Sequence, residues 1–147
     1  MALTVLIDGD GCPVVNEAVA LAREFHADCV IFCDTAHQME REGAQTITVS
    51  KGADSADFAL VNRVHAGDIV ITQDYGLAAM CLSKSARILN QDGKRYTAEN
   101  IDGLLFSRYV GKKVRKAGGR LKGPPKRKPE QTARFVQALR QLLEEST

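Results

Sequence analysis

Several aspartates in this sequence follow short apolar runs directly, in positions where carboxylates can hold a metal ion. Asp8 and Asp10 come after the apolar run Leu3–Ile7 and are separated only by Gly9. Asp74 closes a second apolar run in the same way. Carboxylate oxygens are the ligands that Mg²⁺ and Mn²⁺ prefer, and such ions activate water for attack on phosphate. The spacing therefore predicts a divalent-metal site.

Asp54 and Asp57 form a second acidic pair, three residues apart, ahead of a predicted helix. Asp54 as N-cap and Asp57 as N3 residue would resemble a capping box. The same spacing points both carboxylates to one side of the first helical turn. Asp8 and Asp10 also have a structural interpretation, because acidic residues often cap and charge helix starts. The structural and chemical interpretations stay open for both pairs.

The elements that must position these carboxylates alternate between strands and helices. Leu3–Ile7 is too short for a helix and apolar on both faces, which predicts a buried strand. Gly9 and Gly11 allow a sharp turn, and Pro13 suits the first position of a helix. Similar patterns predict strands at 28–33, 45–49, 67–73 and 86–89, and helices at 14–25, 55–65, 75–82, 97–109 and 130–144.

We predict an α/β fold, a single three-layer domain with a parallel sheet in the order of about 3-2-1-4-5 and additional C-terminal helices. The 147 residues, 44% of them hydrophobic, suit one substantial core. The alternation implies right-handed crossovers and a sheet covered on both faces. In this order the first and fourth strands are neighbours, so Asp8, Asp10 and Asp74 would line the crevice between them, with Asp54 and Asp57 arriving from the adjoining helix.

A cluster of ionised aspartates needs a neutralising partner. Two like charges about 5 Å apart repel by roughly 3 kcal/mol at an effective dielectric constant near 20. No lysine or arginine is adjacent in sequence to Asp8, Asp10 or Asp74. We therefore expect Mg²⁺ or Mn²⁺ as the cofactor.

Two predicted helices carry an apolar face for packing. For the helix at 55–65 the buried face is expected to carry Phe58, Val61 and Val64. For the helix that opens at Thr97 it is expected to carry Ile101, Leu104, Leu105 and Tyr109.

The net charge of +2 conceals an uneven distribution. Residues 108–128, here called the basic segment, contain ten Lys or Arg and no Asp or Glu, while the rest of the chain contains ten basic and eighteen acidic residues. This pattern predicts contacts with nucleic-acid phosphates, with little sequence preference because Tyr109 is the only aromatic residue of the segment. The alternative is a solvated tail. The predicted contact residues are Arg108, Lys112, Lys113, Arg115, Lys116, Arg120, Lys122, Lys126, Arg127 and Lys128.

Localisation and cysteine chemistry follow from what the sequence lacks. There is no secretion signal and no apolar run of about 18 residues, so we expect a cytoplasmic protein without a membrane partner. Its four cysteines form no CxxC pair and are expected to be buried free thiols. Cys12 borders the aspartate turn, but no histidine is close in sequence to activate it as a nucleophile.

Five stretches together resemble the YaiI/YqxD-type family of small bacterial proteins, which belongs to the PIN-like nuclease superfamily. They are Ile7–Pro13, Gly52–Asp57, Gly67–Ala79, Tyr96–Asp102 and Lys122–Arg127. They span nearly the whole chain and in combination are highly specific for that family, although not for one reaction. The family more often has alanine at the positions of Gly9 and Gly11, a difference that removes no carboxylate.

The resemblance implies a PIN-like domain that binds Mg²⁺ or Mn²⁺ and cleaves phosphodiesters of RNA or DNA, with RNA favoured. Acids after the first strand, on a central helix and after the fourth strand bind the metal in PIN-like nucleases. Those roles fall on Asp8, on Asp54 or Asp57, and on Asp74, with Asp10 as a further ligand.

Two other function classes remain. Phosphatases of the haloacid dehalogenase type also begin with a strand followed by Asp-x-Asp, and there Asp8 would be the nucleophile and Asp10 the general acid and base. Ser50, Lys51 and Asp74 could complete such a site, but a helix starting at Pro13 leaves little room for the flap that these enzymes usually carry. The third class is a nucleic-acid or protein binding module without turnover. The oligomeric state is left open.

Overall fold

The computed structural model of the protein describes residues 3–34, 39–50, 55–116 and 126–146, with the side chains of Ser55, Arg108 and residues 112–116 left aside. Strands and helices alternate through β5 as the sequence predicts, except that β3 follows β2 with no helix between them in the part of the chain that the structure describes. The elements in chain order are β1 (Thr4–Asp8), α1 (Val15–Glu24), β2 (Asp28–Asp34), β3 (Gln45–Val49), α2 (Ser55–Arg63), β4 (Ile69–Ile71), α3 (Tyr75–Leu82), β5 (Arg87–Leu89), β6 (Arg95–Tyr96), α4 (Ala98–Lys116) and α5 (Pro129–Glu145).

All six strands belong to one sheet in the order β3-β2-β1-β4-β5-β6. The first five strands are parallel, so the predicted order 3-2-1-4-5 is confirmed. β1 lies at the centre, where Leu6 pairs with Val30 on one side and with Val70 on the other. β6 was not predicted, because its two residues are too few to show a strand pattern, and it pairs antiparallel with β5.

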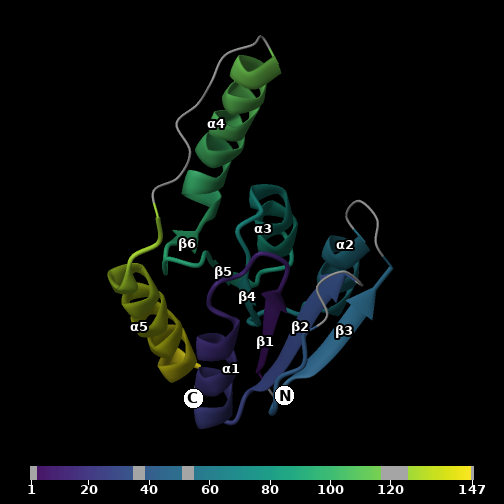
Figure 1. Ribbon diagram of the computed structural model, residues 1–147, viewed down its shortest axis with the longest axis vertical. Helices are drawn as coiled ribbons and strands as arrows, with labels where there is room; N and C mark the ends of the chain where they lie inside the picture. Colours follow the sequence, from purple (N-terminus) through teal and green to yellow (C-terminus); the bar gives the residue numbers. More distant parts are fainter. Residues whose placement is uncertain (1–2, 35–38, 51–54, 117–125, 147) are drawn as a thin grey trace.

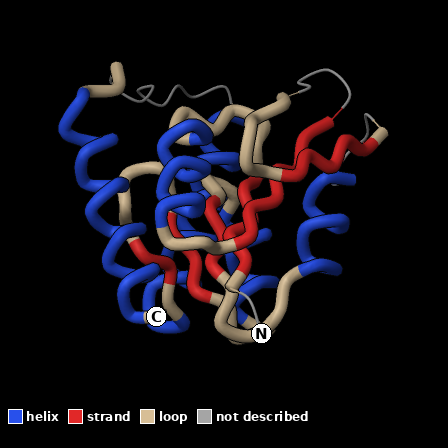
Figure 2. Tube along the Cα trace, turned by 90° about the horizontal axis from the view of Figure 1, so that it is seen from below, coloured by secondary structure: helices blue, strands red, loops and turns tan. Residues whose placement is uncertain are grey.

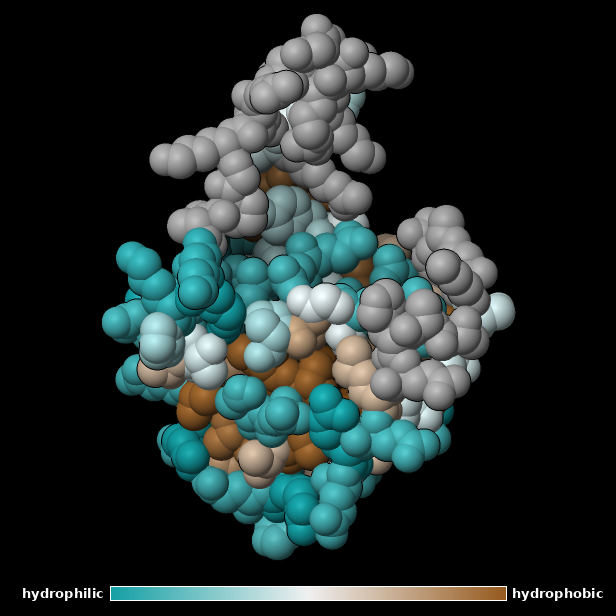
Figure 3. Space-filling view, viewed as in Figure 1, coloured by the Kyte–Doolittle hydropathy of each residue, from teal (hydrophilic) through white to brown (hydrophobic). Residues whose placement is uncertain are grey.

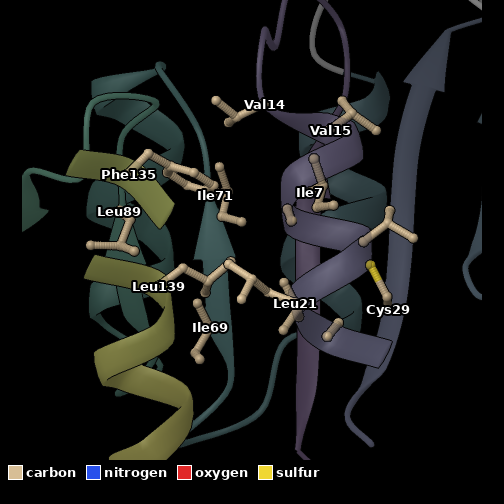
Figure 4. Close-up of a cluster of buried hydrophobic side chains, with 14 of the residues drawn as sticks. Ile7, Val14, Val15, Leu21, Cys29, Ile69, Ile71, Leu89, Phe135 and Leu139 are labelled. Atoms are coloured by element: carbon tan, nitrogen blue, oxygen red, sulfur yellow. The ribbon is translucent and has the colours of Figure 1, made fainter. Parts of the chain in front are cut away.

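Helices cover both faces of this sheet (Figures 1 and 2). One core lies between the sheet and helices α1 and α5, and the other between the sheet and helices α2, α3 and α4. Ile7 points into the first core and its neighbour Leu6 into the second, because successive side chains of a strand face opposite ways. Figure 4 shows the first core, where Ile7 and Ile71 of the sheet lie between Val15 of α1 and Phe135 of α5.

Two predicted helix faces need correction. Val64, directly after α2, is buried as predicted. On α2 itself the buried residue is Leu60, whereas Phe58 is 59% exposed and Val61 only partly buried. The prediction followed apolar spacing, but helix α2 packs on β1 and β2 through a side that excludes Phe58. On α4 the expected Tyr109 is 55% exposed, because the helix continues past the part of the molecule that covers Ile101.

The first half of the basic segment is helical. α4 extends to Lys116 and stands away from the sheet, at the end of the molecule where β1 and the following loop finish (Figure 1). Residues 108–116 therefore belong to a helix and are not an irregular tail. Residues 117–125, with Arg120 and Lys122, lie outside the described residues.

Hydrophobic residues visible in Figure 3 gather around α1 and the neighbouring side of α5, with hydrophilic residues around them. Among the described helices none has the length and apolar character needed to cross a membrane.

Candidate functional site

The carboxyl edge of the sheet brings Asp8, Asp10 and Asp74 together. Asp8 is the last residue of β1, and Asp10 follows two residues later in the turn. Asp74 lies beyond the end of the neighbouring strand β4, at the start of α3. The charges of Asp74 and Asp10 both act on the carboxyl of Asp8. All three aspartates therefore lie at this edge of the sheet, close enough for the charges of Asp10 and Asp74 to affect Asp8.

Asp8 has a perturbed acidity. Burial raises the pKa of its carboxyl from 3.8 to about 6, and the negative charges of Asp74 and Asp10 contribute in the same direction. A hydrogen bond from Thr72 acts against this shift. A carboxyl group with a pKa near 6 is partly protonated at mildly acidic pH. The charge of Asp8 therefore depends on how the negative charges at this edge of the sheet are neutralised.

Thr72 connects the two strands of the site. Its hydroxyl donates a 2.7 Å hydrogen bond to Oδ2 of Asp8 and accepts one of 3.0 Å from the backbone N–H of Asp74. Its own backbone N–H donates to the carbonyl of Leu89 at 3.1 Å, and the residue is only 2% exposed. Sequence reasoning missed Thr72. The signal was a hydroxyl residue between an apolar strand and an aspartate.

Asp74 is the N-cap of α3. Its Oδ1 accepts hydrogen bonds from the backbone N–H groups of Gly76 (2.8 Å) and Leu77 (3.2 Å). Asp74 therefore has a structural role as a helix cap, which was not predicted from the sequence. Its charge still contributes to the raised pKa of Asp8. One aspartate thus both starts a helix and adds negative charge to the edge.

Asp10 is held by the neighbouring strand. Its carboxylate oxygens accept from the backbone N–H of Asp34, the last residue of β2, at 3.2 and 3.4 Å. Asp34 thus places a fourth carboxylate at this edge, which sequence reasoning missed because the residue only ends an ordinary strand. Gly9 makes the turn fit, since a Cβ there would lie 2.9 Å from Cγ2 of Ile31.

The second acidic pair is described only in part. Asp57 lies in the first turn of α2, whereas Asp54 is outside the described residues. Burial raises the pKa of Cys81 to about 12, and the charges of Asp57 and Asp8 add to this effect. Both carboxylates therefore act on the same thiol of α3, which places Asp57 on the side of the sheet that α2 and α3 cover.

The three aspartates are not a preformed metal cage. Among the described residues, no three His, Cys, Asp or Glu side chains are grouped closely enough to hold a metal ion. The donor set nevertheless fits a hard divalent cation by its chemistry, because carboxylate oxygens of like charge meet at one edge and raise the pKa of Asp8. A bound cation would lower the repulsion between them.

The surroundings of Cys12 disfavour its thiolate form. Burial raises the pKa of its thiol to about 11, and the negative charges of Asp8 and Glu17 contribute in the same direction. Since the thiolate is the reactive form, a thiol with this pKa is unreactive at neutral pH. Cys29, Cys33 and Cys81 are buried free thiols, as expected from the sequence.

Arg127 has a structural role at the end of the basic segment. Its guanidinium donates to the carboxylate of Asp92 at 2.7 Å, to the carbonyl of Gln91 at 2.8 Å and to the hydroxyl of Thr132 at 3.1 Å. These contacts connect the start of α5 to the turn between β5 and β6. Lys126 and Lys128, its neighbours, are exposed.

Comparisons with known proteins agree with this architecture. Residues 6–145 match the family model described as "Uncharacterized BCR, YaiI/YqxD family". The chain belongs to the YaiI/YqxD family. It is similar to a "UPF0178 protein" of Exiguobacterium sibiricum, with 50% identity over 99% of both chains. A protein of the same description from Enterococcus faecalis is 41% identical over 98% of this chain and 99% of its own. No solved structure gives a significant match.

The YaiI/YqxD match includes the carboxyl edge and extends through almost all of α5. The Natranaerobius thermophilus relative, 40% identical, covers 96% of both chains. The family therefore shares the whole domain, from the first strand to the last helix.

Proposed function

We propose that this chain is a divalent-metal-dependent nuclease with a PIN-like fold, which hydrolyses phosphodiester bonds of RNA or DNA at the carboxyl edge of its sheet. The observation that carries the proposal is the convergence of Asp8, Asp10 and Asp74, whose like charges contribute to a pKa of about 6 for Asp8. An edge of this kind favours the binding of a cation over a neutral ligand.

Asp8, Asp10 and Asp74 would hold Mg²⁺ or Mn²⁺, with Asp54 or Asp57 as further ligands. When bound, such an ion supplies an activated water and stabilises negative charge on the phosphate. Thr72 fixes the orientation of Asp8 by its hydrogen bond. The backbone N–H of Asp34 does the same for Asp10.

The basic segment supplies affinity for the polymer. Arg108, Lys112 and Lys113 belong to α4. This helix rises from the end of the molecule where β1 finishes, which is the carboxyl edge of the sheet (Figure 1). Phosphates held along α4 would therefore lead a strand toward Asp8. Arg127 is left out of this surface because it binds Asp92.

The test is cleavage of mixed single-stranded RNA and DNA oligonucleotides with and without Mn²⁺, on the wild type and on Asp74→Asn. Asparagine is as good an N-cap as aspartate, so α3 should form normally in this variant. We expect metal-dependent cleavage by the wild type, and its loss in Asp74→Asn with nucleic-acid binding retained. Asp28→Asn, exposed at the start of β2 and therefore at the opposite edge of the sheet, removes the same charge away from the site and should cleave normally.

Each alternative predicts a different outcome. A wild type that binds oligonucleotides but does not cleave them with either metal ion would contradict the nuclease and favour a binding module. Phosphorylation of Asp8, detected as labelling by beryllium fluoride, would favour the haloacid dehalogenase type. In the structure, residues 11–14 alone separate Asp10 from α1, which agrees with the lack of room for a flap.

A further inference from the structure

The outer face of α4 exposes large apolar side chains in succession. Phe106 is 66% exposed, Tyr109 55% and Val110 42%. Their spacing of three and four residues puts them on one side of the helix. Ile101 on the other side is 7% exposed and packs in the core with Leu104. We call Gly103, Phe106, Tyr109 and Val110 the α4 outer face.

Gly103 makes the α4 outer face flat beside Phe106. A Cβ at this position would meet nothing within 4 Å, so no neighbouring atom requires glycine here. Glycine inside a helix is destabilising by roughly 0.5–1 kcal/mol relative to alanine. The packing of the protein therefore does not require glycine at this position. A ligand that lies flat against the helix would explain it.

Charge indicates what kind of ligand this is. Residues 108–116 of α4 contain five Lys or Arg and no acidic residue. Lys113 follows Phe106 by seven residues and Tyr109 by four, so its position lies on the same side of the helix. Exposed rings followed by a concentration of positive charge match a polymer that carries both flat aromatic groups and phosphates.

We propose that the α4 outer face is a base-stacking surface for unpaired nucleotides. The inference rests on the proposed function and specifies the form of its substrate. In a duplex the faces of the bases are covered by their neighbours, whereas a single strand can place them against Phe106 and Tyr109. Phe106 and Tyr109 are about 4.5 Å apart along the helix axis, from three residues at a rise of about 1.5 Å each. Recognition by stacking tolerates any base.

Binding measurements by fluorescence anisotropy in EDTA separate stacking from charge. The three probes are a single-stranded oligonucleotide, its duplex, and an abasic strand of the same length. Stacking contributes about 1–3 kcal/mol per base, so Phe106→Ala and Tyr109→Ala should each weaken single-strand binding about tenfold. Affinity for the duplex and for the abasic strand should change less than about twofold. Phe106→Trp should restore single-strand binding.

Phe58→Ala is the matched control. Phe58 is 59% exposed on α2, away from the basic segment, and its removal should not change any of the three affinities. All three side chains replaced in this test are exposed, so none of the substitutions should unfold the protein.

Three outcomes would overturn the inference. The first is unchanged single-strand affinity in Phe106→Ala. The second is an equal loss on all three probes, which would indicate a general defect. The third is a wild-type dimer that Phe106→Ala converts to a monomer without loss of affinity, because a second copy would then cover the face. If the wild type cleaves nucleic acid but Phe106→Ala binds it normally, the stacking inference fails and the nuclease proposal stands. If the wild type stacks bases but does not cleave, the nuclease proposal fails and the stacking inference stands.

Discussion

The hydroxyl of Thr72 donates a 2.7 Å hydrogen bond to Oδ2 of Asp8, a residue 64 positions earlier in the chain. The same hydroxyl accepts from the backbone N–H of Asp74 at 3.0 Å. Thr72 is only 2% exposed and is fixed by the hydrogen bond from its own backbone to Leu89. It therefore fixes the positions of Asp8 and Asp74 relative to each other. The acidity of Asp8 and the start of α3 are thus connected through one side chain.

Replacing Thr72 by valine should raise the pKa of Asp8 above its value of about 6. Valine has nearly the same shape but no hydroxyl, so the one hydrogen bond that lowers this pKa is lost. A pH titration of the Asp8 carboxyl carbon by NMR measures the change. Thr72→Ser keeps the hydroxyl and should stay close to wild type. An unchanged pKa in Thr72→Val would show that the bond does not affect the acidity of Asp8.

Asp8→Asn should stabilise the metal-free protein at neutral pH. The pKa of Asp8 rises from 3.8 to about 6 on folding, so the folded state binds its proton more tightly and loses stability as pH rises through this range. The penalty is absent below about 4 and complete above about 6. A shift of about two units corresponds to about 3 kcal/mol. Asparagine avoids it while still accepting from Thr72.

Urea unfolding in EDTA at pH 4 and pH 7.5 measures this effect. Asp8→Asn should gain up to about 3 kcal/mol of unfolding free energy over the wild type at pH 7.5 and almost nothing at pH 4. Asp102→Asn, an exposed substitution, should show no such difference. An equal gain at both pH values would mean that the charge of Asp8 is not its source.

Addition of Mn²⁺ should cancel most of the stability difference between Asp8→Asn and the wild type. A cation held by Asp8, Asp10 and Asp74 binds only the folded state and relieves their repulsion. At a concentration 100 times the dissociation constant this adds about 2.7 kcal/mol. Thermal unfolding with Mn²⁺ and then with excess EDTA should show a reversible rise of the midpoint for the wild type. Asp8→Asn should show none. A similar rise in both proteins would place the ion elsewhere.

Arg127→Gln should reduce stability rather than nucleic-acid affinity. Its guanidinium bonds with Asp92 and Gln91 join the start of α5 to the β5–β6 turn, and their loss should cost about 1–2 kcal/mol. A double-mutant cycle with Asp92→Asn should give a coupling of about 1 kcal/mol. Lys126→Gln next to it should instead weaken oligonucleotide binding and leave unfolding unchanged. If Arg127→Gln instead weakened oligonucleotide binding and left unfolding unchanged, Arg127 would belong to the phosphate-binding surface.

Much of the fold could be predicted because its causes are local in the chain. β1 and β4 are short apolar runs that cannot form helices, and their alternation with helical segments restricts the sheet to very few topologies. The buried face of α5 has a local cause too, since Phe135 and Leu139 repeat at helical spacing and both are fully buried. The regular spacing of apolar residues along a strand or helix indicates which of its sides faces the core.

The sequence by itself therefore determined the order of the sheet and the meeting of Asp8, Asp10 and Asp74 at one edge. Only the tertiary structure decided which groups surround them, namely Thr72 on Asp8 and the backbone of Asp34 on Asp10. It also decided that Phe58 and Tyr109 face outward. These outcomes depend on contacts between residues far apart in the chain and on where neighbouring elements end, and a hydrogen bond or an uncovered side chain of this kind leaves no periodic pattern in the sequence.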